Sequence, residues 1–580
     1  MTIPVNILSQ SVSPVAYFSM EIGLNSTMPT YSGGLGVLAG DTLKAAADMG
    51  QPMIAISLLN RKGYFRQHLD LDGNQTESPV VWNPSDYLQP MDKYISVQIE
   101  GRTVKIKAWR HEIQGLGGFT IPVYFLDTSL PENSPWDQTL TDYLYGGDSR
   151  YRLCQEIILG IGGIAVLRAM GYQTLQAYHM NEGHSALLIL SLFEEQMNKL
   201  HICNINQECV KDIRELCVFT THTPVAAAID KFPFDMVRHV LGDEHTANLV
   251  SAGCFQDNML NMTFLGLCFS HYINGVSMRH EEISQGMFPN YPINSITNGV
   301  HAGTWTSPAM SAVFDKHIPE WRRDNLYLRY TVSIPVEEIQ DAHALAKREL
   351  ISEVVKRRGI TLDKNILTLG FARRATGYKR ADLLFSDINR LKQIASNVGP
   401  LQIIYAGKAH PQDGSGKEII RSVFRAAKEL RDIIRVVYLE EYDMELARLL
   451  CSGVDIWLNT PKKPEEASGT SGMKAALNGV PSLSILDGWW VEGHVEGVTG
   501  WSIGENWEKA SNSEIEIASL YNKLEFVVMP LFYSRASSFA WVMRNSIAFN
   551  GSFYNSQRML SQYIKNAYFS NGNRDNRGQS

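Results

Sequence analysis

The chain has 580 residues, a formal net charge of −7, 44% hydrophobic residues and 19% charged residues. This is the composition of a globular protein, and it excludes collagen-like, fibrous and intrinsically disordered chains. The mildly acidic balance also argues against a nucleic-acid-binding protein, which usually carries a basic surface. At about 100–200 residues per domain, the length predicts two or three domains.

The cysteines and the start of the chain bear on its compartment. The seven cysteines are scattered and form no CxxC pair, which argues against a disulfide framework or a zinc cluster and favours a reducing compartment. The first twenty residues lack the basic start and the apolar core of a signal peptide. The longest apolar run, 157–167, is too short to span a membrane. We therefore expect a cytoplasmic protein that binds neither nucleic acid nor membranes.

The N-terminal half alternates predicted strands with predicted helices. Strands are expected at 15–20, 52–59, 120–127, 174–180 and 216–222, and a hairpin at 96–109 that turns at Glu100-Gly101. Helices are expected at about 37–49, 153–170 and 185–197. A longer helix at about 336–358, begun near Pro335 and stopped by Gly359, has the position of a domain connector.

The C-terminal half shows a more regular alternation of predicted strands and helices. Short apolar runs at 365–371, 401–406, 435–440, 454–459 and 480–486 alternate with helical patterns at about 381–396, 418–430, 444–453 and 473–479. Continuously apolar strands are typical of a parallel sheet that is covered on both faces. Ligands of such sheets bind beyond the carboxyl ends of the strands, so the following loops are the expected binding loops. The aromatic and apolar tail at 520–567 is expected to pack against the rest, and 571–580 to be disordered.

The loop after the run at 365–371 is rich in cations. Arg373, Arg374, Lys379 and Arg380 fall within eight residues, between a predicted strand and a predicted helix. Cations beside the free amides of a helix N-terminus make a site for phosphate or another anion. A solvated basic loop is the alternative, and the position at a strand end favours the anion site.

A second loop, EEASGTSGMK at 465–474, leads into a helix. It lacks the GxxxxGK[ST] spacing of a nucleotide-binding P-loop. Lys474 has apolar neighbours on both sides, so burial can lower its pKa, and such a lysine can form a Schiff base. A lysine exposed on a flexible turn is the alternative that spacing alone leaves open.

Further polar clusters are less specific. YSGGLG at 31–36 opens a helix without the GxGxxG dinucleotide pattern, so it is either a close-packed turn or a set of amides for an anion or sugar hydroxyls. NEGH at 181–184, THTP at 221–224 and TNGVH at 297–301 follow predicted strands, and each histidine taken singly is more often structural. HEEIS at 280–284 lacks the second histidine of a zinc motif, and no metal site is predicted. GxSxG is absent.

Taken together and in this order, these segments resemble the α-glucan phosphorylases, in their shorter bacterial form. The segment EASGTSGMKAALNG is similar to the lysine segment of the family that holds its cofactor, and ARRATGYKR to its phosphate-binding segment. GGLGVLAGDTLKAAADMG, NEGHSALL, TTHTP, SITNGVHAGTW and GKAHP also resemble family segments. The resemblance runs from about Val15 to Phe569, and several independent motifs in one order make it specific.

The resemblance implies a fold and a division of the chain. The fold is α/β, with two Rossmann-like domains facing across a cleft in the GT-B arrangement. Residues 1–335 are expected to form the glucan-binding domain and 336–540 the domain that binds cofactor and phosphate. Residues 541–570 are expected to form a helix that crosses back to the first domain. A homodimer is common in the family, and the sequence leaves the oligomeric state open.

The resemblance also implies a glycosyltransferase reaction. Inorganic phosphate would cleave the terminal glucosyl unit from an α-1,4-glucan such as glycogen, starch or maltodextrin and give α-glucose 1-phosphate with retention. Pyridoxal 5′-phosphate would be bound to Lys474 as a Schiff base, and its phosphate group would relay a proton. Arg374 would hold substrate phosphate, and Arg373 and Lys379 would serve the pair of phosphates. Thr470 and Trp305 would contact the cofactor.

The sugar contacts carry over in the same way. His222 would bind a glucosyl hydroxyl at the reaction centre. The other residues expected around the glucosyl unit and its phosphate are Gly33, Gly34, Leu35, Asn298, Tyr378, Glu466, Ser468, Gly469 and Asp148. A site that hydrogen-bonds every hydroxyl rejects similar sugars strongly.

The chain departs from the family pattern at several positions. Arg373 stands where members usually have lysine, which changes the donor geometry but keeps the charge. Ser471-Gly472 replaces Gly-Asn before the lysine segment, and the loop at 145–148 is short. SITNGVHAGTW lacks the paired arginines of longer relatives, and the regulatory N-terminal extension of the animal enzymes is not expected.

Two other functions remain as alternatives. A nucleotide-sugar glucosyltransferase of the same architecture would need a nucleotide site where the cofactor is expected. A non-catalytic glucan-binding protein would be favoured if Lys474, Arg374 or His222 were replaced, and all three are present.

Overall fold

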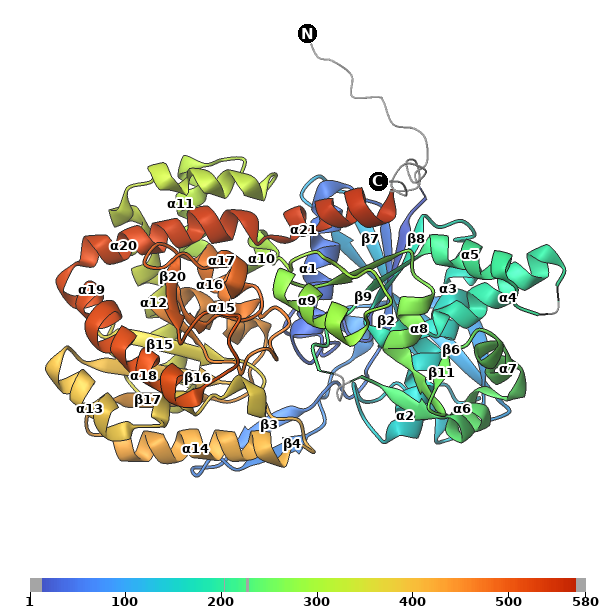
Figure 1. Ribbon diagram of the computed structural model, residues 1–580, viewed down its shortest axis with the longest axis horizontal. Helices are drawn as coiled ribbons and strands as arrows, with labels where there is room; N and C mark the ends of the chain where they lie inside the picture. Colours follow the sequence, from blue (N-terminus) through green and yellow to red (C-terminus); the bar gives the residue numbers. More distant parts are fainter. Residues whose placement is uncertain (1–12, 203, 226–228, 570–580) are drawn as a thin grey trace, which may run out of the picture.

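The computed structural model describes residues 13–202, 204–225 and 229–569. Figure 1 shows two lobes side by side, each with a β-sheet surrounded by helices. The nine-stranded sheet has the order β14-β13-β9-β8-β1-β2-β7-β6-β5, and the six-stranded sheet the order β17-β16-β15-β18-β19-β20. No helix of the described residues is both long and apolar enough to cross a membrane.

The nine-stranded sheet is parallel from β14 to β7, and β6 and β5 add an antiparallel edge. Its strands are β1 (Val15–Phe18), β2 (Met53–Leu58), β5 (Gln89–Ile99), β6 (Arg102–Gln114), β7 (Thr120–Asp127), β8 (Ala177–Asn181), β9 (Cys217–Thr220), β13 (Tyr272–Gly275) and β14 (Asn294–Ser295). A small sheet of β10 (Lys231–Pro233), β11 (Phe255–Gln256) and β12 (Met259–Asn261) lies in the same lobe.

The helices of this lobe are α1 (Gly34–Met49), α2 (Ser149–Ile157), α3 (Gly163–Ala169), α4 (Leu188–Leu200), α5 (Gln207–Leu216), α6 (Phe234–Leu241), α7 (Asp243–Ser251), α8 (Met262–Cys268) and α9 (Met278–Met287). The predicted strands and the hairpin are confirmed, and the turn residues Glu100 and Gly101 both have positive φ, 53° and 72°. The helix predicted at 153–170 is divided, because a π-helical turn at Ile158–Gly162 separates α2 from α3.

The six-stranded sheet is parallel throughout. Its strands are β15 (Leu367–Ala372), β16 (Leu401–Ala406), β17 (Arg435–Leu439), β18 (Ile456–Asn459), β19 (Ser482–Ile485) and β20 (Gly500–Ile503). The first five confirm the predicted runs, and β20 was missed because its four residues begin with glycine and include a serine.

The helices of this half are α10 (Ala302–Trp305), α11 (Pro308–His317), α12 (Val336–Arg358), α13 (Ile388–Asn397), α14 (Gly414–Leu430), α15 (Met444–Gly453), α16 (Ser471–Leu477), α17 (Trp490–Gly493), α18 (Ser513–Lys523), α19 (Met529–Ser534), α20 (Ala536–Asn545) and α21 (Ser556–Tyr563). α12 has the predicted bounds, with Gly359 in the left-handed region at φ 65°. α13 begins later than predicted, because Asp387 caps it by accepting a hydrogen bond from the amide of Arg390.

Two segments join the lobes. Trp305, Phe314 and Trp321 precede α12 in the chain, yet they belong to the hydrophobic core around the six-stranded sheet. In the opposite direction, α21 packs on α1, and Figure 1 shows it (red) over the lobe that contains the N-terminal strands. The predicted packing of the apolar tail is thereby confirmed up to residue 567, while the prediction for 571–580 lies outside the described residues.

A hairpin that the sequence did not reveal also joins the lobes. It consists of β3 (Arg66–Leu69) and β4 (Gln75–Ser78), and Figure 1 shows it (blue) beside α14 of the other lobe. The Gln67 side chain donates to the carbonyl of Gly407 at 2.9 Å, and Gln75 donates to that of Ala409 at 2.8 Å. The hairpin therefore fixes the loop that follows β16.

Candidate active site

The loops after β15, β18 and β19 bring the cation segment and the lysine segment together. Arg373 Nη1 donates to Glu466 Oε2 at 3.0 Å, and Lys379 Nζ donates to the same oxygen at 2.5 Å. The amide of Glu466 donates to Asp487 Oδ2 at 3.0 Å. Residues more than eighty positions apart therefore meet at the carboxyl ends of neighbouring parallel strands.

The cluster around Glu466 is buried and strongly charged. Burial raises the pKa of Glu466, but the charges of Arg373 and Lys379 outweigh it, so the pKa lies below its ordinary value. Burial raises the pKa of Asp487 to about 7, and the nearby charge of Glu466 adds to the rise. The cluster thus holds two cations against one firmly ionised carboxylate.

Lys474 lies in α16, one turn after Thr470, whose carbonyl accepts from the Lys474 amide at 3.2 Å. Its Nζ is 3.8 Å from the centre of the Trp305 ring, and the residue is 6% exposed. The Trp305 indole donates in turn to Asp41 Oδ2 at 2.8 Å. Burial lowers the pKa of Lys474, although the charge of Asp41 opposes this. A buried lysine of this kind is a good nucleophile for a carbonyl group.

Several buried polar atoms in these segments have no hydrogen-bond partner within the protein. They are Asp41 Oδ1, Arg373 Nε, Thr376 Oγ1, Ser468 Oγ and Asn298 Oδ1. Each such atom costs about 1–3 kcal/mol when it is left without a partner. The free donors Arg373 Nε and Thr376 Oγ1 fit the oxygens of an anionic ligand, and the free oxygens of Asp41, Ser468 and Asn298 fit donor groups such as hydroxyls.

The N-terminus of α1 is open on the other lobe. A Cβ added at Gly33 or Gly34 would meet no atom within 4 Å. The amides of Ser32 and Gly33 donate to Glu21 Oε2 at 2.5 and 3.2 Å, so a carboxylate of the chain already occupies part of this anion-binding end. Sequence reasoning missed Glu21, and its place just after the first strand was the only available signal. Leu35 follows in the first turn of the helix.

His222 follows β9 and is held by its neighbours. Its Nε2 is 2.7 Å from Asn181 Oδ1, and its amide donates to Glu182 Oε2 at 2.7 Å. Burial lowers the pKa of His222 to about 3, so the ring is neutral at physiological pH. With Nε2 donating to Asn181, Nδ1 is left as an acceptor.

Glu182 holds this arrangement in a strained backbone. Its φ is 77°, which is rare for a residue with a side chain and costs about 1–3 kcal/mol. Its carboxylate accepts from the amides of Gly183 and His222 and from the Thr223 hydroxyl. Strain of this size persists where several bonds over-determine one conformation, as they do here.

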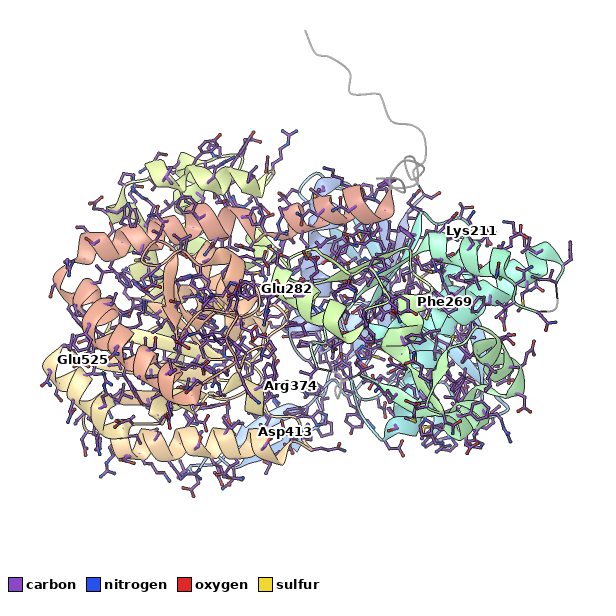
Figure 2. The ribbon with its side chains drawn as sticks, viewed as in Figure 1. Lys211, Phe269, Glu282, Arg374, Asp413 and Glu525 are labelled. Atoms are coloured by element: carbon purple, nitrogen blue, oxygen red, sulfur yellow. The ribbon has the colours of Figure 1, made fainter. Side chains whose placement is uncertain are left out.

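Arg374 and Asp148 lie apart from the cluster of Arg373, Lys379 and Glu466. Arg374 is exposed, and Figure 2 shows it where the two lobes face each other, near Asp413. Burial and then the charge of Arg374 lower the pKa of His410. Asp148 is exposed and caps α2 by accepting from the Tyr151 amide at 2.9 Å. Its predicted sugar contact stays a prediction.

The remaining predicted residues lie within the loops already described. Lys379 Nζ is 4.4 Å from the centre of the Tyr378 ring. Gly469 has a φ of 84°, and an added Cβ would lie 3.2 Å from the Glu466 carboxyl carbon. Glycine therefore allows the backbone turn at this position to pack closely on the Glu466 side chain. Asn298 is joined to the second lobe through its neighbour Thr297, whose hydroxyl donates to Glu492 Oε2 at 2.7 Å.

Comparison with known proteins identifies the family of the chain. The family model described as carbohydrate phosphorylase matches residues 242–500. The maltodextrin phosphorylase of Thermococcus litoralis is 39% identical, over 96% of this chain and 70% of its own length. The chain belongs to the carbohydrate phosphorylase family. The glycogen phosphorylases of Aquifex aeolicus and Mycobacterium tuberculosis are each 35% identical over 96% of this chain, and over 86% and 70% of their own lengths.

Within this carbohydrate phosphorylase, the match to the family model includes Lys474, Glu466, Arg373 and Lys379. His222 and the N-terminus of α1 precede that match, and the similarity to the relatives extends over 96% of the chain. The similarity to phosphorylases therefore covers the candidate site residues of both lobes.

Proposed function

We propose that this protein is an α-1,4-glucan phosphorylase. It uses inorganic phosphate to release the terminal glucosyl unit of glycogen, starch or maltodextrin as α-glucose 1-phosphate, with retention. The observation that carries the proposal is the buried Lys474 against Trp305, at the end of the loop whose Glu466 holds Arg373 and Lys379. The relatives named maltodextrin phosphorylase and glycogen phosphorylase support the same reaction.

The residues present fit pyridoxal 5′-phosphate as the cofactor. Lys474 would hold its carbonyl carbon, and Trp305 packs against the same nitrogen. Arg373 Nε and Thr376 Oγ1 are buried donors without partners, as a phosphate group requires, and Thr470 and Lys379 would complete its contacts. When bound, the cofactor would supply a phosphate group that relays a proton to and from substrate phosphate.

The cations of the site have a clear electrostatic task. Two unit charges about 5 Å apart at an effective dielectric near 20 repel by roughly 3 kcal/mol, and two phosphates multiply this. Arg373 and Lys379 offset that repulsion, and Arg374 would hold substrate phosphate from the side that faces the other lobe. Glu466 pairs with both Arg373 and Lys379, so anion binding competes with Glu466 for them.

The glucosyl unit would be held from both lobes. His222, neutral and accepting at Nδ1, would bind one hydroxyl, and Asn298 Oδ1 and Ser468 Oγ are buried atoms without partners that suit others. Glu466, Gly469, Tyr378 and the amides at Gly34 and Leu35 would complete the pocket. Because each polar atom needs a hydroxyl, the site would discriminate against sugars that lack one.

In this proposal the two lobes are Rossmann-like domains that face each other across a cleft, with the sequence-predicted bounds 1–335 and 336–540, and 541–570 crosses back. Trp305, Phe314 and Trp321 of the first range pack in the core of the second lobe. The bonds that the hairpin of β3 and β4 makes to the second lobe support a substrate site between lobes. We place the enzyme in the cytoplasm, with glucan, phosphate and glucose 1-phosphate as its partners. A homodimer stays a prediction.

The test is to incubate the purified protein with maltodextrin and measure glucose 1-phosphate with and without inorganic phosphate. The proposal predicts a product that depends on phosphate and on Lys474. Glucosyl transfer from a nucleotide sugar without any phosphorolysis would favour the glucosyltransferase alternative. Glucan binding with neither activity would favour a binding protein.

A further inference from the structure

The loop that carries Asn298 is held by the C-terminal segment of the chain. The amide of Val300 donates to the carbonyl of Tyr554 at 3.1 Å, and the amide of Ser556 donates to that of Val300 at 2.9 Å. Between these bonds, a Cβ at Gly299 would lie only 2.1 Å from the carbonyl oxygen of Asn555. The two backbones are therefore in direct contact, and only glycine allows it.

Arg558 of α21 strengthens this contact with its guanidinium group. Nη1 donates to the carbonyl of Thr297 at 2.7 Å, and Nη2 donates to that of Asn298 at 2.9 Å. Nε donates to the carbonyl of Phe553, and Nη1 also donates to Gln562 Oε1. Burial lowers the pKa of Arg558 to about 10. A largely buried charge that binds backbone carbonyls in this way fixes the positions of those carbonyls.

The side-chain oxygen of Asn298 is buried and free. The residue is 4% exposed, its amide donates to the carbonyl of Val276 at 3.1 Å, and its carbonyl accepts from Arg558. Its side-chain Oδ1 has no partner. The backbone of this residue is therefore fixed on two sides, while the side chain stays available to a ligand.

We propose that Arg558 is a positioning residue for the glucosyl substrate. It holds the backbone at Thr297 and Asn298 so that the Asn298 side chain is already oriented for a sugar hydroxyl before substrate arrives. The C-terminal segment is then part of the substrate site, although it touches no substrate itself. This inference rests on the proposed function, because it takes the ligand of Asn298 to be the glucosyl unit.

The chemistry of the guanidinium explains why arginine is required. Its planar fork reaches two neighbouring carbonyls at once, whereas the ammonium group of lysine is a point charge that cannot match both. Arg558→Lys keeps the charge and most of the apolar stem, and it removes the paired contact to Thr297 and Asn298 together with the Nε bond to the carbonyl of Phe553. A misplacement of about 1 Å at a substrate contact can cost up to about 100-fold in rate.

Gln557 provides a matched control in the same helix. Its Oε1 accepts from the amide of Asn325 at 2.9 Å, and its Nε2 donates to the carbonyl of Arg322 at 3.0 Å. Gln557→Ala therefore loosens the docking of α21 without touching Thr297 or Asn298. Any loss of activity caused only by a less stable helix should appear in both variants.

The experiment measures kcat and KM with glucose 1-phosphate in the direction of glucan synthesis, together with the melting temperature. We expect Arg558→Lys to raise the KM about 10-fold or more, and Gln557→Ala to lower the melting temperature with an unchanged KM. Hydrogen exchange over 297–300 should quicken in Arg558→Lys and not in Gln557→Ala.

The outcomes separate the inference from the proposed function. If the wild type is active and the KM of Arg558→Lys equals that of Gln557→Ala, Arg558 is only an anchor of the helix and the inference is overturned. A wild type that performs no phosphorolysis overturns the proposed function, and the substrate role of Arg558 with it.

Discussion

Replacing Glu466 by glutamine tests whether Arg373 and Lys379 form an anion site. The change keeps the shape of the side chain and removes its charge. The side chains of Arg373, Lys379 and Glu466 are only 9%, 10% and 6% exposed. Removing one partner of such a buried ion pair usually costs about 3–5 kcal/mol, because the opposite charge stays buried without compensation. Here two cations share the one carboxylate, so we expect a loss of stability in this range.

Inorganic phosphate should restore much of that stability. In the wild type, phosphate competes with Glu466 for the two cations, and in Glu466→Gln it meets no competitor. A tenfold gain in phosphate affinity adds about 1.4 kcal/mol of stabilisation at saturating phosphate. The melting temperature of the variant should therefore rise more with added phosphate than that of the wild type.

The assay is thermal unfolding in phosphate-free buffer and over a phosphate titration. Glu505→Gln is the control, since Glu505 pairs with Lys509 on the surface and its loss should change stability by less than about 0.5 kcal/mol. Equal phosphate stabilisation in the wild type and Glu466→Gln would refute the reasoning, because the cations would then not be shared between Glu466 and an anion.

Three further predictions follow from the site. Arg374→Ala should raise the KM for phosphate with little change in the KM for glucan, and unchanged phosphate kinetics would contradict its role. His222→Ala should lower kcat with glucan. The pH profile of kcat should keep its shape from about pH 5 to about pH 8, because a pKa of about 3 leaves the His222 ring neutral throughout that range. A shift of the acidic limb of the profile in the variant would show that His222 titrates in this range. The folded-state pKa of Asp487, about 7, lies above its ordinary 3.8, so its proton stabilises the fold at low pH and that stabilisation is lost as the pH rises to 7. Asp487→Asn should therefore gain melting temperature relative to the wild type from about pH 5 to about pH 8, and a constant difference would show that Asp487 does not titrate there.

The part of the fold that could be predicted is the part that local pattern encodes. The strands from β15 to β19 are continuous apolar runs that are covered on both faces, and the ends of α12 are marked by Pro335 and Gly359. The apolar neighbours of Lys474 in α16 favoured its burial as one of two alternatives that the spacing left open. In each case the residues that decide the structure lie within a few positions of one another.

The contacts that escaped prediction are those between distant residues. Arg558 and Asn298 are 260 positions apart, and nothing in either segment indicates the other. The hairpin of β3 and β4 is short and polar, and its glutamines find their partners more than 330 positions away. Glu21 became a site residue only because the fold places it at the N-terminus of α1. The glutamine contacts depend on how the two lobes meet, and the contacts of Arg558 and Glu21 depend on how the N-terminal lobe folds, which no local pattern records.

Lys474, as the residue that would carry the cofactor, is central to the proposed function. The most direct test is to reduce the native protein with borohydride, digest it and locate any added pyridoxyl phosphate by mass spectrometry. We predict that the added mass lies on Lys474 and is absent from Lys474→Ala, which should also form no glucose 1-phosphate. A protein that performs phosphorolysis with an unmodified Lys474, or with the added mass on another lysine, would contradict the account.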